Sequence, residues 1–340
     1  MADLGDDVDR EREVAELRAA NVRLQRSNAR LREGSENLVA AVERGVRDAL
    51  ITVGRASPVP RPPRDRRRDE EVALVWFGDW QLGKRTISYD TEVCKRRVNR
   101  AVEKVISITE VQRADHPVRR CNLVLGGDML EGISIFKKQA WEVDSGLYAQ
   151  LMAAARLIAD SVLTLLANFE AVTVDEVWGN HGRVGMKGEL PSEENLDRVL
   201  CRIAREMIGH QPRLTWDEPE VRWHKVIVID NYRALIFHGD QVRSGGGQLP
   251  AYGIAKKVTA WSAGVTEPFH DAYLGHYHQD MKLTIPNGGR IFMTPSTESD
   301  SEFAREFVAA KGRPGQRLHF VNPRKGEVTG EYVIWLEDVE

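Results

Sequence analysis

The sequence predicts a layered α/β domain, and three observations lead to this class. Short apolar runs alternate with segments of helical spacing between residues 72 and 208, a pattern typical of strands joined by helices. After Gly209 the apolar runs lie closer together around turn signatures such as the Pro-Asn-Gly-Gly at 286–289, so the second half is rich in strands. Five of the runs end in a Gly beside Asp, Asn or His, and polar residues at strand ends meet along one rim.

Two segments precede this domain. Residues 1–53 form the first, and leucines recur every seven residues in it at Leu17, Leu24, Leu31 and Leu38, with Asn21 and Asn28 among the residues three positions earlier. This pattern predicts a coiled-coil helix that joins chains into a homo-oligomer through residues 10–53. A lone amphipathic helix folded against the body, a trimer, or pairing with another protein are the alternatives.

Residues 54–71 read as a linker. Four prolines and a cluster of five arginines within residues 61–68 favour an extended, solvated chain over a packed core. The arginines could instead contact nucleic-acid phosphates. The catalytic body then spans residues 72–340.

Composition limits the function classes. A net charge of −3 over 340 residues gives no global attraction to nucleic acid or to an anionic membrane. Three cysteines without CxxC spacing suit reduced thiols and a cytoplasmic setting. We expect no signal peptide, because the start is acidic, and no membrane association, because no run looks long enough to span a bilayer.

The ends of the five runs supply a set of hard oxygen and imidazole ligands. The set comprises Asp79, Asp128, Asn180, His238, His276 and His278. Such a set can hold two divalent ions ~3.5–4 Å apart, which would clamp the attacking and leaving oxygens of an in-line displacement at phosphorus. We expect Asp128 to bridge the ions, a hydroxide between them to attack, and His181 to protonate the leaving oxygen or stabilise the phosphoryl charge. Mn²⁺ suits these ligands best; Mg²⁺, Fe²⁺ and Zn²⁺ remain open.

The order of these motifs resembles that of the calcineurin-like metallophosphoesterase family, whose pattern is D-x-H, GD-x-x-D/E, GNH-D/E, a lone His and GH-x-H. This sequence has Asp79-Trp80-Gln81, Gly127-Asp128 with Glu131, Gly179-Asn180-His181-Gly182, His238, and Gly275-His276-Tyr277-His278. The resemblance covers roughly residues 72 to 300 and implies a four-layer αββα sandwich with two metals at its rim.

The resemblance also implies a role for each matching residue. Asp79, Asp128 and His278 would hold the first metal, and Asp128, Asn180, His238 and His276 the second. His181 stands at the position of the catalytic histidine, and Glu131 at that of the carboxylate that orients it.

Two positions depart from the family pattern. Gln81 stands where the family usually has a histidine ligand, so we include it as a weak ligand of the first metal, with the alternative that it does not ligate. Gly182 stands where the family often has Asp or Glu, which leaves Glu131 as the expected partner of His181.

The sequence gives less direct information about the substrate. The D-x-Q-L-G run at 79–83 looks like the D-x-H-L-G form of SbcD/Mre-type DNA nucleases. We therefore expect a phosphodiesterase acting on DNA, an exo- or endonuclease. We also expect it to be encoded by a phage or prophage and to be located in the host cytoplasm. One alternative is a phosphomonoesterase or small phosphodiesterase acting on nucleotides or phosphoproteins. Another is an interaction module that acts through its coiled coil and carries a vestigial site.

Three neighbours of the motifs have open roles. Trp80 could stack on a base or pack beneath its loop, and Lys84 could meet a substrate phosphate. Asp240 could orient the His238 ring or cap the turn that follows.

Overall fold

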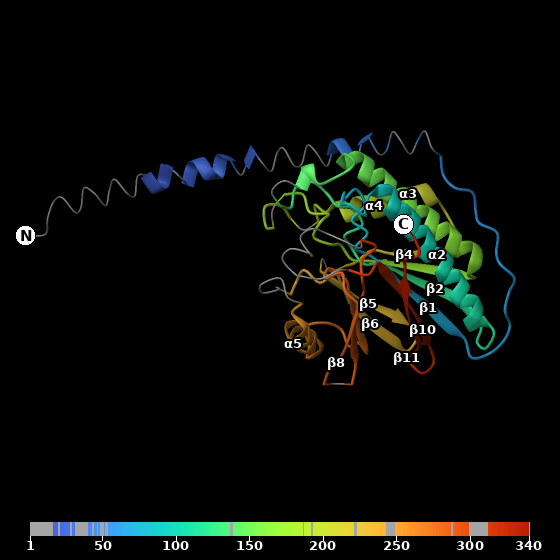
Figure 1. Ribbon diagram of the computed structural model, residues 1–340. Helices are drawn as coiled ribbons and strands as arrows, with labels where there is room; N and C mark the ends of the chain where they lie inside the picture. Colours follow the sequence, from blue (N-terminus) through green and yellow to red (C-terminus); the bar gives the residue numbers. More distant parts are fainter. Residues whose placement is uncertain are drawn as a thin grey trace, which may run out of the picture.

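The computed structural model describes residues 16–339, except for 20, 28, 31–39, 43, 46, 48–50, 52–53, 137–138, 186, 192, 221–222, 243–248, 287 and 299–311. Two sheets lie face to face in it, with helices on both outer sides (Figure 1). The fold is therefore the four-layer αββα sandwich that the sequence predicted.

The first sheet has parallel strands at its centre. Its strands, in spatial order, are β11 (Glu327–Trp335), β10 (Gly315–Asn322), β1 (Glu71–Phe77), β2 (Val118–Leu125), β3 (Ala171–Glu176) and β4 (Leu214–Asp217). Strands β1 to β4 run parallel to one another, β10 pairs antiparallel with β1, and β11 pairs antiparallel with β10. The carboxyl ends of β1, β2 and β3 consequently lie side by side at one rim.

The second sheet brings two more strand ends to that rim. Its order is β5 (His224–Ile229), β6 (Tyr232–Phe237), β7 (Asp271–Leu274), β9 (Arg290–Met293) and β8 (Met281–Thr284). Strands β6, β7 and β9 are parallel, and β5 and β8 pair antiparallel at the edges.

Strand β1 is buried on both faces, and its two faces belong to different cores. Ala73, Val75 and Phe77 pack into the core under helices α2 (Thr91–Arg113), α3 (Leu147–Asn168) and α4 (Leu196–Ile208). The alternate residues Val72, Leu74 and Trp76 face the second sheet. Helix α5 (Ala251–Ser262) covers the far side of that sheet through a third core. A short 3-10 helix, η1 (Gln139–Trp141), lies between β2 and α3.

Helix α3 corrects one expectation from the sequence. Among the described residues it is the one helix that is long and apolar enough to span a membrane. However, 61% of its apolar window is buried inside the molecule, where it packs against the first sheet. Its hydrophobicity is accounted for by this packing. The three cysteines are buried and form no disulfides.

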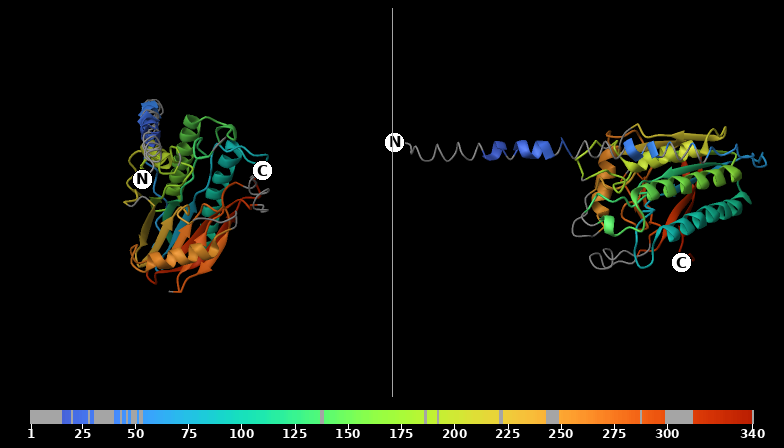
Figure 2. Two further views of the ribbon diagram at one scale, coloured as in Figure 1. Left: turned by 90° about the vertical axis from the view of Figure 1, so that its left-hand side faces the viewer. Right: turned by 90° about the horizontal axis from the view of Figure 1, so that it is seen from above.

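The N-terminal segment is only partly described. Leu17 and Leu24 lie on helical turns and are each 62% exposed. These turns are drawn in blue at the N-terminal end of the chain (Figure 2). Leu31 and Leu38 lie outside the described residues, so the coiled coil remains a prediction. Val42 is only 8% exposed and joins the core beneath the helices, and Gly45 lies against Tyr148 of α3. The end of this segment therefore packs on the body.

The linker is extended but is not a free tether. Residues 54–70 have no helix or strand and are hydrogen-bonded to the body along their length. The Val59 amide donates to Gln211, Arg61 pairs with Glu170, and the carbonyl of Asp65 accepts from Arg119. These bonds fix the path of the chain into β1.

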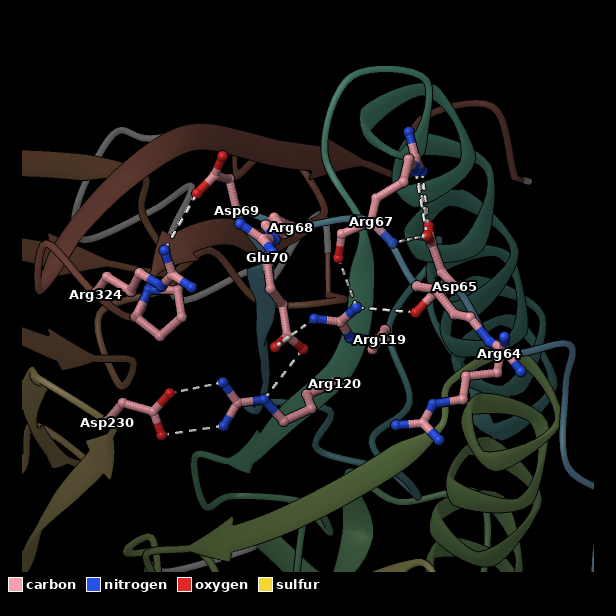
Figure 3. A pocket seen from close by; sticks show the side chains of 12 residues that line it. Arg64, Asp65, Arg67, Arg68, Asp69, Glu70, Arg119, Arg120, Asp230 and Arg324 are labelled. Atoms are coloured by element: carbon pink, nitrogen blue, oxygen red, sulfur yellow. Dashed lines mark hydrogen bonds and ion pairs between the residues drawn. The ribbon is translucent and has the colours of Figure 1, made fainter.

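Two of the five arginines of the cluster, Arg61 and Arg67, form such pairs. The other three, together with Arg67, line a hollow of about 560 Å³ at the start of β2, beside the β5–β6 and β10–β11 turns (Figure 3). There Arg120 pairs with Glu70 and Asp230, and Arg67 pairs with Asp65. The hollow lies at the amino end of the parallel strands, opposite the rim where the predicted ligands gather.

The exposed leucines of the N-terminal segment lead to a first prediction. Deleting residues 1–38 removes the predicted seam and keeps Val42 in its core. We expect light scattering to show an oligomer for the full chain and a monomer for the truncated chain, with equal thermal stability of the body. Equal masses for the two proteins would rule out assembly through this helix.

Candidate metal centre

Five loops meet at the rim, one from each of β1, β2, β3, β6 and β7. Backbone hydrogen bonds tie them together: the Asp79 amide donates to Gly127 O at 2.9 Å, and the Gln81 amide donates to Asp128 O at 2.9 Å. In the second sheet the Gly275 amide donates to His238 O at 2.9 Å. The structure therefore brings the predicted ligands to one place.

The backbone at this rim is held in a costly conformation. The residues with left-handed φ angles there are Asp79 (51°), Gln81 (43°), Asp128 (53°), His276 (68°) and His278 (55°). Among the described non-glycine residues only two others have positive φ. Such angles cost of order 1–3 kcal/mol each and persist where surrounding contacts enforce them. The contacts here aim side chains from tight turns at a common centre.

Two motif glycines allow the loops to approach so closely. A Cβ on Gly179 would lie 2.0 Å from Asp128 Oδ1, and a Cβ on Gly275 would lie 2.0 Å from Asp79 Oδ2. Any side chain at either position would displace a carboxylate. The glycine before each ligand is therefore a steric requirement of the centre.

A cation pocket is formed by three of the predicted ligands. Donor atoms of Asp128, His238 and His276 all lie within 4.8 Å of one another. His238 Nε2 lies 3.0 Å from Asp128 Oδ2 and 3.2 Å from Asn180 Oδ1. His238 Nδ1 donates to Gly126 O at 2.9 Å, which leaves Nε2 as the nitrogen that faces the pocket. A carboxylate, two imidazoles and an amide oxygen fit a divalent transition metal.

The electrostatics of this pocket suit a cation. Burial opposes ionisation of Asp128, but the charges of His238 and His181 outweigh burial and hold the pKa of Asp128 below its ordinary value. Burial likewise opposes protonation of His238, but Asp128 raises the pKa of His238 to about 10. The protonated ring of His238 and the carboxylate of Asp128 thus form a buried ion pair. A metal would take the place of that proton and release it.

His181 lies beside the pocket and is oriented by Glu131. The His181 amide donates to Asp128 Oδ1 at 2.7 Å. Its Nδ1 donates to Glu131 O at 2.9 Å and lies 3.2 Å from Glu131 Oε2. Because a carbonyl only accepts, Nδ1 carries the hydrogen and Nε2 points inward, 4.0 Å from Asp128 Oδ2.

The other side of the centre is built differently. The His276 amide donates to both oxygens of Asp79 at 3.0 Å, and His278 Nε2 lies 3.5 Å from Asp79 Oδ1. Gln81 fills the space between His278 and His181. Within the described part of the chain, no second group of three acidic, histidine or cysteine ligands forms here.

Asp197 is a residue of the centre that the sequence did not reveal. It follows the Asn195 N-cap of α4 and is 1% exposed. Its Oδ2 accepts from the amides of Asp128 (2.9 Å) and Gly179 (2.8 Å), and its Oδ1 accepts from Met129 (3.1 Å). Burial and the charge of Asp128 raise the pKa of Asp197 to about 6. An acidic residue in the first turn of a helix is an ordinary capping signal, which concealed this role.

Two open roles are now decided. Trp80 is fully buried, packs on Phe77 at 6.1 Å between ring centroids, and is therefore not exposed for stacking on a base. Asp240 pairs with Arg183 and Lys187, while the carbonyl of Gly126 orients His238 instead.

No protein-family model matches the chain. It is 19% identical over 300 residues to the SPbeta prophage-derived protein YonJ of Bacillus subtilis, covering 83% of this chain and 69% of that protein. Similar solved structures include Vps29 with zinc from Entamoeba histolytica (12% identity, TM-score 0.33) and a dimetal phosphatase from Danio rerio (10% identity, TM-score 0.35). Each match covers 78% of this chain and 99% of the other. The assignment of the sandwich itself rests on the strand order and cores described above.

Asp197 gives a second prediction. Asp197→Ala leaves three buried N–H groups without an acceptor, at about 1–3 kcal/mol for each unpaired group. We expect the free energy of unfolding in urea to fall by roughly 3 kcal/mol or more. Asp115→Ala is the control, since its side chain is 88% exposed, and should change stability by less than about 0.5 kcal/mol. Equal losses in both variants would contradict the positioning role of Asp197.

Proposed function

We propose that this chain is a divalent-cation-dependent phosphoester hydrolase whose substrate is a phosphodiester of DNA. The observation that carries the proposal is the preformed Asp128–His238–His276 pocket with an oriented His181 beside it. Asp128, Asn180, His238 and His276 would hold the cation, with Mn²⁺ the best fit to their mixed oxygen and imidazole donors. When bound, such a cation supplies charge stabilisation to a phosphoryl group and lowers the pKa of water.

The chain's own residues supply the proton chemistry. His181 Nε2 faces the pocket, and the Glu131 carbonyl and carboxylate fix Nδ1–H on the opposite side of the ring. This geometry suits donation of a proton from Nε2 to a leaving oxygen, with Glu131 stabilising the charged ring. Asp128 joins the two parts, because its carboxylate contacts His238 and accepts from the His181 amide.

The choice of DNA rests on the sequence. The D-x-Q-L-G run at 79–83 resembles that of SbcD/Mre-type nucleases, and the predicted coil would pair two such sites. The similarity to a prophage-derived protein supports a phage origin and thus a place in the host cytoplasm. The arginine-lined hollow lies at the opposite end of the sandwich and does not bear on the scissile bond.

A substrate panel tests this proposal. With Mn²⁺ we expect hydrolysis of single- or double-stranded DNA and of bis-p-nitrophenyl phosphate, with little turnover of p-nitrophenyl phosphate. Turnover of the monoester alone would make the enzyme a phosphomonoesterase. No turnover with Mn²⁺, Mg²⁺, Fe²⁺ or Zn²⁺ would favour an interaction module that acts through its coiled coil.

Removing the cation or its central ligand gives a third prediction. Dialysis against a chelator should abolish turnover, and Mn²⁺ should restore it. Asp128→Asn should abolish turnover and weaken Mn²⁺ binding in titration calorimetry, because the amide removes the buried negative charge. Wild-type rates in Asp128→Asn would refute the assignment of the centre.

His181 gives a fourth prediction. His181→Asn removes the inward-facing imidazole and should lower kcat on DNA by ~10²–10⁴-fold, the usual contribution of general acid catalysis. Mn²⁺ affinity should stay within a few-fold of wild type, since His181 is not among the pocket's ligands. His116→Asn, at a surface position remote from the rim, is the matched control and should leave kcat unchanged.

A further inference from the structure

The amide oxygen of Gln81 is held by Lys84, away from the metal position. Lys84 Nζ donates to Gln81 Oε1 at 3.0 Å and to Glu298 Oε2 at 2.9 Å. The Lys84 side chain is 18% exposed and that of Glu298 only 3%, so this is a largely buried ion pair. Glu298 also contacts the ring of His278, whose Nδ1 lies 3.4 Å from Glu298 Oε2.

The orientation of the Gln81 amide follows from its neighbours. An ammonium group only donates hydrogen bonds, so the acceptor oxygen of the amide must face Lys84. The amide nitrogen then lies 3.2 Å from His181 Nε2 and 3.2 Å from His278 Nε2. An amide nitrogen with two hydrogens has no lone pair to offer a metal. Turning the amide over would set its NH₂ group against the ammonium.

The first-metal position therefore lacks a ligand and gains a positive charge. Asp79 and His278 remain there, but an ammonium lies within hydrogen-bonding distance of the adjacent amide. Moving Lys84 away would leave the buried Glu298 carboxylate with the His278 ring but without the ammonium, which is unfavourable. Both effects disfavour a cation beside Asp79. Neither reaches the Asp128–His238–His276 pocket, whose ligands come from other loops.

We propose that this chain binds one divalent cation, in the Asp128–His238–His276 pocket, and that Lys84 acting through Gln81 takes the place of the first cation of a dimetal centre. Lys84 and Gln81 are positioning residues in this arrangement. The Gln81 amide nitrogen lies between the rings of His181 and His278, and Lys84 supplies the positive charge behind it. This replaces the two-metal expectation from the sequence with an asymmetric, one-metal centre.

The test counts Mn²⁺ on the full chain by elemental analysis after equilibrium dialysis, together with electron paramagnetic resonance. We expect one Mn²⁺ per chain and the six-line hyperfine spectrum of an isolated ion. Two ions per chain with a spin-coupled spectrum would overturn the inference, and so would no bound ion. The count does not depend on turnover, so an inactive chain with one bound ion would defeat the proposed function and leave this inference standing.

Variants test the role of the pair. Gln81→His/Lys84→Met restores an imidazole and removes the ammonium, and should raise the count from one to two. Lys95→Met is the matched control, because Lys95 pairs with Glu92 on the surface of α2, and should keep a count of one. A folded double variant that still binds one ion, judged by its thermal melt, would contradict the role of Lys84. If the double variant fails to fold, the wild-type count and spectrum still decide the number of ions.

Discussion

The Asp197 carboxylate is the constraint on which the centre depends. By accepting from three backbone amides it joins the loop after β2 to the loop after β3. The loop after β2 carries Asp128, and the loop after β3 carries His181. Asp128 contacts His238 and accepts from the His181 amide. That clamp and the Gln81 amide, which donates to Asp128 O, hold the left-handed turn at Asp128. A buried acid at the start of α4 thus sets the geometry of ligands that lie far from it in the sequence.

The sequence was sufficient for the fold and for much of the centre, for a physical reason. Buried parallel strands leave continuous apolar runs, and ligands at strand ends follow those runs directly, so Asp128, His238 and His276 could be placed in one rim before their contacts were known. Contacts that depend on tertiary packing could not be read this way. Asp197 resembled a helix cap, and the burial of Trp80 depends on its packing against Phe77.

The same limit applies to charge. Gln81 was recognisable as an unusual residue at a ligand position, but its orientation depends on Lys84, three residues on, and on Glu298 from the opposite side of the sandwich. The Gln81 amide is bonded to Lys84, which forms an ion pair with Glu298 of another loop. Gln81, Lys84 and Glu298 therefore act together. Their contact could not be predicted from the sequence, because Glu298 lies far from the other two along the chain.

The path of residues 54–70 bears on what the N-terminal segment can reach. The chain leaves Val42 beside the start of α3, near the rim, and travels along the helical face to the opposite end before entering β1 (Figures 1 and 2). Hydrogen bonds hold residues 59–65 against the body along this path. A partner that bound the chain next to Val42 would therefore lie beside the start of α3.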